Sequence, residues 1–109
     1  MPKDAQLLKG ILEGCVLALL RRETTYGYRV VEMLGDSGFA GIQEATVYPI
    51  LNRLDKKGLL SHEKRPSEIG PPRKYYSLTA AGERALRDFM ESWFSIRGNV
   101  DRVLEEVKK

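Results

Sequence analysis

The side chains best suited to binding chemistry lie in one stretch, residues 43–60, with the sequence QEATVYPILNRLDKKGLL. Its apolar positions recur at helical spacing: Val47, Ile50, Leu51 and Leu54. The opposite side of the predicted helix carries a proline and three hydrogen-bond donors: Pro49, Asn52, Arg53 and Lys56. Amide, guanidinium and ammonium groups on one helix face can donate to base edges or phosphates. The stretch is therefore typical of a helix that enters a nucleic-acid groove.

The end of this helix is better marked than its start. Gly58 can adopt the left-handed conformation that closes a helix, and the two lysines before it suit the carbonyl end of the helix dipole. At the start, a cap at Thr46 would place Pro49 in the first turn, whereas a start at Glu44 would cost one hydrogen bond at Pro49. The sequence leaves both starts open.

The net charge of +3 lies in the central third of the chain. Residues 43–78 carry seven Lys and Arg against four Asp and Glu, while residues 1–42 and 79–109 are each neutral. This distribution predicts a surface for a polyanion, and its alternative is an ordinary solvated face.

Beyond Gly58 the spacing changes from helical to alternating, which predicts two strands. Leu60 and His62 share one side of the first strand, and Tyr76 and Leu78 share one side of the second. The prolines and glycine between them exclude regular structure and predict a hairpin with a mobile tip and a basic returning strand. His62 has no second ligand at a metal spacing, so we interpret it as a strand residue.

Two further helices precede the central stretch. Apolar doublets four residues apart predict one buried helix: Leu7, Leu8, Ile11, Leu12, Cys15, Val16, Leu19 and Leu20. Thr25 can cap a second helix that ends near Leu34 and places Tyr28 on its apolar side, and Phe39 and Ile42 are expected to anchor the loop that follows. Three helices in about 55 residues are compatible with a helix-turn-helix whose third helix is the reading helix.

The last predicted helix starts after Thr79, a good cap, and its apolar residues repeat every seven positions. The repeat consists of Leu86, Phe89, Trp93, Ile96, Val100, Val103 and Val107. So narrow a stripe must be buried on a partner. A second copy of the chain is the simplest partner, and folding back onto the same domain is the alternative. We therefore expect a DNA-binding domain at residues 1–78 and a dimerisation helix at residues 79–109.

Composition bounds the class of protein. A chain of 109 residues supports one small domain, and its single cysteine, Cys15, lies in an apolar run that favours a core role in a reducing compartment. The longest apolar run, residues 11–20, is interrupted by Glu13 and Gly14 and is too short to span a membrane, so we expect a soluble cytoplasmic protein. There is no phosphate-binding glycine loop after a strand and no metal cluster, which argues against an enzyme and predicts no cofactor or metal.

Four stretches, taken together and in order, resemble the PadR family of transcriptional regulators: Tyr26-Gly27-Tyr28, residues 45–54 (ATVYPILNRL), residues 57–60 (KGLL) and residues 70–79 (GPPRKYYSLT). The single C-terminal helix resembles the smaller subgroup of that family. The resemblance implies a mainly α-helical winged helix-turn-helix with a small β-hairpin wing, acting as a homodimeric repressor on pseudo-palindromic operator DNA.

The resemblance also implies which residues contact DNA. In the reading helix these are Thr46, Tyr48, Pro49, Asn52 and Arg53, and in the wing they are Lys64, Arg65, Arg73 and Lys74. Asn52 and Arg53 can contact base edges or phosphates, whereas Lys56 and Lys57 suit the phosphate backbone. For Tyr48, which lies on a flank of the helix, packing competes with a phosphate contact. Glu63 and Glu68 reduce the positive charge of the wing.

In the smaller subgroup, a tryptophan at the position of Trp93 can line a hydrophobic space at the dimer interface that accepts flat aromatic compounds. The resemblance therefore implies a ligand site at Trp93 with Phe89 and Phe94, and a repressor released by such a ligand. The alternative for Trp93 is a plain core role.

One alternative function stays open from the sequence. A winged helix can also serve as a protein-interaction module that uses its apolar and tyrosine-bearing faces and does not bind DNA.

Overall fold

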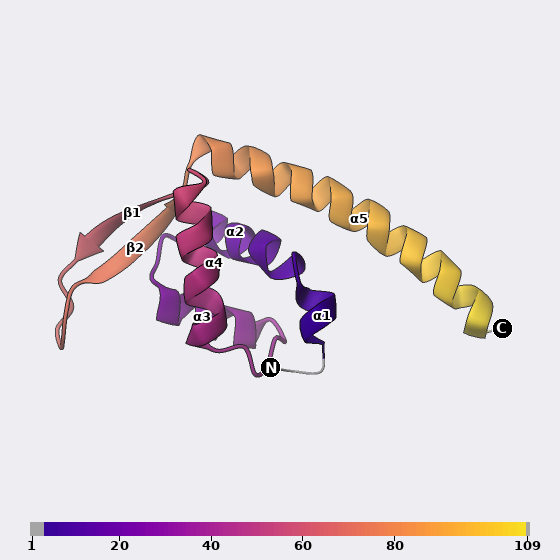
Figure 1. Ribbon diagram of the computed structural model, residues 1–109, viewed down its shortest axis with the longest axis horizontal. Coiled ribbons are helices and arrows are strands. Elements are labelled where there is room, and N and C mark those ends of the chain that lie inside the picture. The colour runs from indigo at the N-terminus through magenta and orange to yellow at the C-terminus, as the bar shows by residue number, and fades with distance from the viewer. Residues whose placement is uncertain (1–3, 109) are drawn as a thin grey trace.

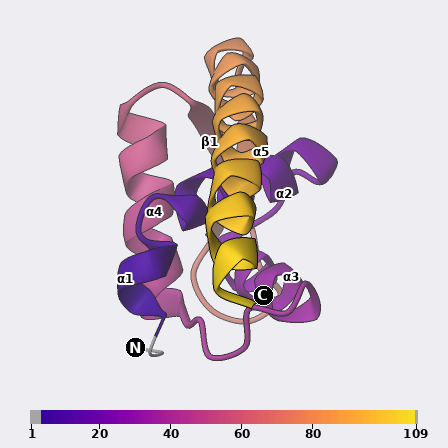
Figure 2. The same ribbon diagram turned by 90° about the vertical axis from the view of Figure 1, so that its right-hand side faces the viewer.

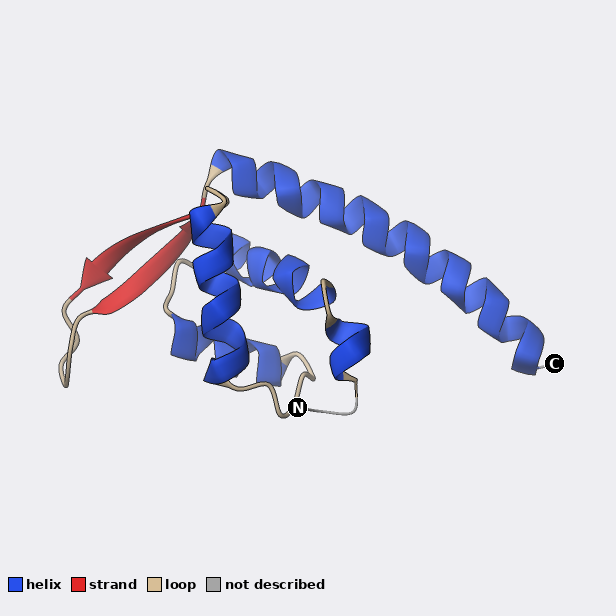
Figure 3. Ribbon diagram, in the orientation of Figure 1, coloured by secondary structure: helices blue, strands red, loops and turns tan. Residues whose placement is uncertain are grey.

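A computed structural model describes residues 4–108, which form five helices and one hairpin (Figures 1 and 3). In chain order the elements are α1 (Ala5–Leu8), α2 (Ile11–Arg22), α3 (Gly27–Asp36), α4 (Glu44–Lys56), β1 (Leu60–Arg65), β2 (Arg73–Leu78) and α5 (Ala80–Lys108). The hairpin and α5 extend from opposite sides of the cluster formed by α2, α3 and α4 (Figure 1). The fold is the predicted one, mainly helical with a hairpin wing and a C-terminal helix.

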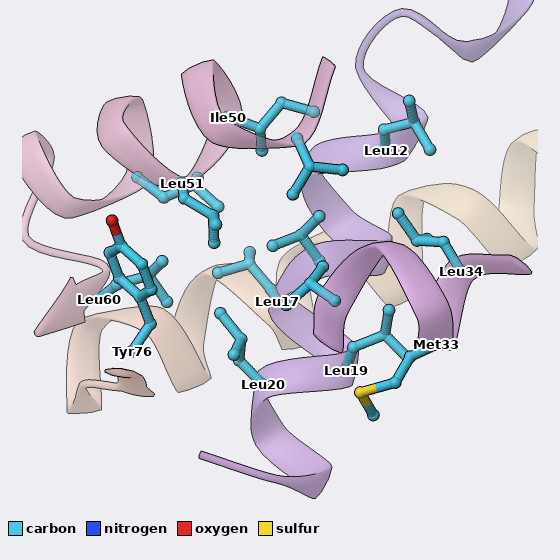
Figure 4. Packing of buried hydrophobic residues seen from close by; sticks show 14 of the residues in the cluster. Leu12, Leu17, Leu19, Leu20, Met33, Leu34, Ile50, Leu51, Leu60 and Tyr76 are labelled. Carbon is cyan, nitrogen blue, oxygen red and sulfur yellow. The ribbon is translucent and has the colours of Figure 1, made fainter. Parts of the chain in front are cut away.

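The core lies where α2, α3 and α4 meet, and β2 and the start of α5 close it (Figure 4). Its most deeply buried side chains come from all three helices: Val16, Val30, Leu34, Val47, Leu51 and Leu54. The predicted anchors of the loop before α4 also pack here, because Ile42 is buried and Phe39 is partly buried against the core. Each fully buried aliphatic side chain contributes about 1.5–3 kcal/mol to stability.

The prediction of a single first helix is wrong in one respect, because this part of the chain forms two helices, α1 and α2. Gly10 has a φ of 88°, a left-handed conformation that breaks the helix between α1 and α2. As a result Leu7 is 71% exposed, while Leu12 and Val16 in α2 are buried. The apolar doublets predicted the burial of α2 but not the change of direction at Gly10.

Thr25 does not cap α3, contrary to the prediction. Tyr26 occupies the N-cap position and makes no side-chain cap hydrogen bond. Thr25 is buried in extended conformation and pairs with Tyr76 of β2: its backbone N–H donates to the Tyr76 carbonyl at 3.3 Å, and the Tyr76 N–H donates to the Thr25 carbonyl at 2.8 Å. Helix α3 therefore begins one residue later than expected. Tyr28, expected on its apolar side, is 51% exposed, because the buried residues Val30, Met33 and Leu34 define a different face of the helix.

Helix α4 begins at the earlier of the two possible starts. It begins at Glu44, so Pro49 lies inside the helix and cannot donate to the carbonyl oxygen of Ala45. The predicted end is confirmed, because Gly58 has a φ of 78° and the Leu59 N–H donates back to the Leu54 carbonyl at 3.0 Å.

The hairpin has the predicted antiparallel pairing. Leu60 pairs with Leu78, His62 with Tyr76 and Lys64 with Lys74. Leu60 and Tyr76 turn into the core at the base of the hairpin, whereas the strand ends near Arg65 and Arg73 are exposed.

Thr79 caps α5 as predicted and also ties it to the end of α4. Its hydroxyl accepts a hydrogen bond from the Gly82 N–H at 3.0 Å and donates to the Gly58 carbonyl at 2.7 Å. Its backbone N–H donates to the Leu59 carbonyl at 3.1 Å. Gly82 lies against this carbonyl so closely that an added Cβ would be 2.1 Å from the oxygen.

The first part of α5 packs on the domain. Leu86 is buried, and the Phe89 ring covers Gly14 of α2, where a Cβ would be 2.3 Å from the ring. Beyond Gly98 the helix continues without a break to Lys108. None of the helices in residues 4–108 is long and apolar enough to cross a membrane.

Candidate nucleic-acid interface

Helix α4 presents an exposed ridge of four residues: Ala45, Pro49, Asn52 and Lys56. Their spacing of four, three and four residues places them in one line on the side opposite the buried Val47, Ile50, Leu51 and Leu54. Burial of the apolar face therefore turns this ridge outward. In Figure 1 the helix lies in front of α2 and α3, with the hairpin on one side and α1 on the other.

On one side of the ridge, a hollow of about 470 Å³, the wing groove, separates α4 from the hairpin and the start of α3. It is lined by Tyr26, Gly27, Tyr28, Glu44, Tyr48, Asn52, Pro72, Arg73, Lys74 and Tyr76. Four predicted contact residues, Tyr48, Asn52, Arg73 and Lys74, are thus brought together here from two elements far apart in the sequence.

Tyr48 fills part of this groove by packing on Gly27. A Cβ at position 27 would be 1.9 Å from Cε1 of the Tyr48 ring, so any larger residue there would require the ring to move. Partial burial raises the pKa of Tyr48, and the charge of Glu44 and a hydrogen bond to its carboxylate raise it further. Of the two roles expected to compete at Tyr48, the structure shows the packing role, because the ring lies against Gly27 of α3. The side chain remains 41% exposed, and its contact with phosphate stays a prediction.

Two arginine side chains and one tyrosine side chain of the wing form a row of contacts with Tyr26 at the start of α3. The Arg73 guanidinium lies 4.4 Å from the centre of the Tyr26 ring, and Tyr26 lies 5.2 Å from Tyr75. The Arg65 guanidinium lies 4.4 Å from the Tyr75 ring on β2. Cation–π contacts of this kind contribute about 0.5–1 kcal/mol each at exposed sites. They fix two predicted phosphate contacts, Arg65 and Arg73, before any DNA is bound.

A second contact joins the hairpin to α4. His62 Nδ1 lies 2.7 Å from the Asp55 carboxylate, and the His62 ring packs beside Tyr76. Burial raises the pKa of Tyr76, and the charge of Asp55 adds to this. His62 is thus a strand residue, as interpreted from the sequence, and its contact with Asp55 joins the wing to α4.

On the other side of the ridge, α4 lies beside α1 and the start of α2 (Figure 2), and residues of these three elements border a second groove. It is lined by Ala5, Leu8, Lys9, Gly10, Leu12, Glu13, Ala45, Thr46, Pro49, Ile50 and Arg53. The predicted set is therefore divided: Thr46, Pro49 and Arg53 line this groove, whereas Tyr48 and Asn52 line the wing groove.

Glu13 of α2 holds two of the predicted contacts. Its carboxylate lies 3.6 Å from Nη2 of Arg53 and 3.7 Å from Nζ of Lys57. Sequence reasoning missed Glu13, because its distance along the chain from α4 hides the contact. It also missed Ala45 and Tyr28, which are exposed because the buried residues of α4 and α3 lie on other faces of these helices.

The remaining predicted sites line neither groove. Lys64 is exposed on the wing, and Lys64 and Lys74 pair across the strands. On α5, Trp93 is partly buried and Phe94 is exposed beside it, whereas Phe89 is packed on α2. Cys15 is partly buried against the core, and burial raises the pKa of its thiol.

A reading helix flanked by a basic hairpin on a three-helix core is the architecture of winged helix-turn-helix proteins. Residues 16–88 match the model of the Transcriptional regulator PadR-like family. The chain belongs to this family of DNA-binding transcriptional regulators.

Solved structures agree with this assignment. A Streptococcus transcriptional regulator is 40% identical, with 91% of this chain and 97% of that chain covered and a TM-score of 0.80. A PadR-like regulator from Bacillus cereus is 38% identical, with 92% and 97% covered and a TM-score of 0.81. A PadR-family regulator from Eggerthella lenta is 39% identical, with 92% and 87% covered and a TM-score of 0.82.

The ion pairs of Glu13 lead to a prediction. Replacing Glu13 by Gln frees Arg53 and Lys57 for phosphate, so affinity for duplex of unrelated sequence should rise about two- to fivefold, since exposed pairs contribute at most about 1 kcal/mol. The dependence of the binding constant on salt should become steeper. Fluorescence anisotropy at several salt concentrations measures both quantities.

The matched control is Glu91→Gln, which changes the net charge equally on the exposed surface of α5. An equal rise in both variants would show that net charge alone is responsible and that the contact of Glu13 with α4 has no effect.

Proposed function

We propose that this regulator is a cytoplasmic, non-catalytic repressor that binds a pseudo-palindromic operator as a homodimer. The observation that carries the proposal is the outward ridge of α4 beside a basic wing already fixed to α3 and α4. Donors on the helix would contact bases and phosphates, and the wing would contact the adjacent backbone.

The proposed DNA contacts are those expected from the sequence. They comprise Thr46, Tyr48, Pro49, Asn52, Arg53, Lys56 and Lys57 of α4 and its end, and Lys64, Arg65, Arg73 and Lys74 of the wing. All of these except Thr46 are exposed. Because Asn52 lies at the centre of the ridge, it is the best placed for a paired contact with adenine.

The exposed part of α5 supports the proposed dimer. Ile96, Val100, Val103 and Val107 lie on one stripe, and Val103 and Val107 are 67% and 80% exposed. An apolar stripe of this length on a helix that extends beyond its domain suits a second copy of the same helix. Leu86 and Phe89 are packed within the chain, so they would position the seam rather than form its centre. Two reading helices would then meet half-sites about one helical turn of DNA, or a multiple of it, apart.

Substitutions in the interface test DNA binding. Arg53→Ala, and the double variant of Arg73 and Lys74 to Ala, should weaken binding to the DNA flanking the gene by about tenfold or more and lower the salt slope by about one per contact removed. Gel-shift titration at several salt concentrations measures both.

Arg87→Ala on the exposed surface of α5 removes the same charge and should leave binding unchanged. Wild-type affinity that is indifferent to DNA sequence, or a salt slope near zero, would contradict the proposal and favour a protein-interaction role.

A charge on the seam tests the dimer. Ile96→Glu should convert a dimer to monomers and abolish tight operator binding, because two carboxylates would be buried at the interface. Sedimentation velocity at micromolar concentration measures the change. Ser95→Glu introduces the same charge one residue away, off the seam, and should remain dimeric. A monomeric wild-type chain that does not dimerise on duplex would overturn the proposal.

We also propose that a flat aromatic ligand binds beside Trp93 and Phe94, with Phe89 nearby on the same helix, and that this ligand releases the repressor from its operator. What supports it is the incomplete burial of Trp93 and the exposure of Phe94 on the helix that would form the dimer. Planar aromatic compounds should quench Trp93 fluorescence and weaken operator binding at the same concentrations. The absence of both effects across a varied panel would assign Trp93 to packing alone.

A further inference from the structure

The ridge of α4 changes chemical character along its length. Ala45 and Pro49 occupy its N-terminal half, and Asn52 and Lys56 occupy its C-terminal half; all four are exposed. In a reading helix, the N-terminal residues are the ones that contact base edges. The part of the ridge placed to reach deepest into a major groove is therefore apolar.

Neither of these two residues can read a base by hydrogen bonding through its side chain. Alanine and proline carry no side-chain donor or acceptor, and Pro49 also lacks a backbone N–H. Both are small, so the helix backbone can approach the bases closely. The polar neighbours Glu44 and Tyr48 lie on one flank of the ridge, lining the wing groove, and Arg53 lies on the other.

The apolar group that unmodified DNA presents in its major groove is the 5-methyl group of thymine. We propose that Ala45 and Pro49 contact thymine methyl groups and so select thymine at one or two positions of each half-site. This inference rests on the proposed DNA binding and adds to it the class of base that is read.

Pro49 has a structural cost that supports the assignment. Inside α4 it removes the hydrogen bond to the Ala45 carbonyl, although an alanine in its place would restore this bond. Since the side chain of Pro49 is exposed, it contributes little burial to offset the loss. A contact between the Pro49 ring and a thymine methyl group would give this side chain a role that its position in the folded monomer does not.

Deoxyuridine provides the test, because it differs from thymidine only by the missing methyl group. Each thymine of a duplex that the wild-type protein binds specifically is replaced in turn, and binding is measured by fluorescence anisotropy. Loss of one buried methyl contact should weaken binding by about three- to fivefold at the contacted positions and leave the others unchanged.

Variants connect the sensitive positions to the two residues. Ala45→Ser and Pro49→Ser place a hydroxyl on the ridge, and each should bring the ratio of thymine to uracil affinity close to one at its own position. Pro49→Ser also restores a backbone donor to α4, so loss of folding would not explain its effect. Ala80→Ser, at the exposed start of α5, is the control and should retain the wild-type profile.

Methylated cytosine is the second source of the same methyl group. If affinity at a sensitive position is higher with 5-methylcytosine than with cytosine, the contact is with a methyl group on either pyrimidine. If the two affinities are equal, the contact is restricted to thymine. Uracil tolerated at every position, or an unchanged profile in both ridge variants, would overturn the inference while leaving the proposed function intact. A wild-type protein that binds no duplex specifically would overturn the proposed function, and this inference with it.

Discussion

The interface depends on the burial of one apolar stripe. The buried residues of α4 are Val47, Ile50, Leu51 and Leu54. Because successive residues of a helix are rotated by about 100°, burial of these four side chains determines which other side chains of α4 face outward. The stripe fixes the rotation of α4 about its axis, and with it the ridge and both grooves. A single apolar face thus determines where every donor on the reading helix lies.

The parts of the fold that could be predicted are those governed by periodicity and local chemistry. The apolar faces, the closing glycine at residue 58, the cap at Thr79 and the pairing of the hairpin depend on residues close in sequence, so the pattern reveals them. The two errors had different sources, one a contact with a distant residue and the other a local break at Gly10. Thr25 is suited to a cap, but pairing with Tyr76 holds it in extended form, and one left-handed glycine divides what looked like a single first helix.

The candidate site shows the same division. Residue types on α4 predicted donors on its outer side, but not that Glu13 binds Arg53 and Lys57 or that Tyr48 requires Gly27 beneath its ring. Nor could the sequence assign the wing arginines to the faces of Tyr26 and Tyr75. Such contacts join residues that are far apart in the chain. The contacts with the tyrosine rings limit the conformations of Arg65 and Arg73, which would lower the entropy that these two side chains lose in the proposed contact with DNA.

The joint around Thr79 has a mechanical consequence. Although the hairpin separates α4 from α5 in sequence, Thr79 bonds directly to the carbonyl groups of Gly58 and Leu59, which follow the end of α4, and Gly82 lies against the Leu59 carbonyl. No flexible linker is available to absorb a twist between the two helices. A change in the direction of the long C-terminal helix would therefore be expected to change the orientation of α4 and of its exposed ridge.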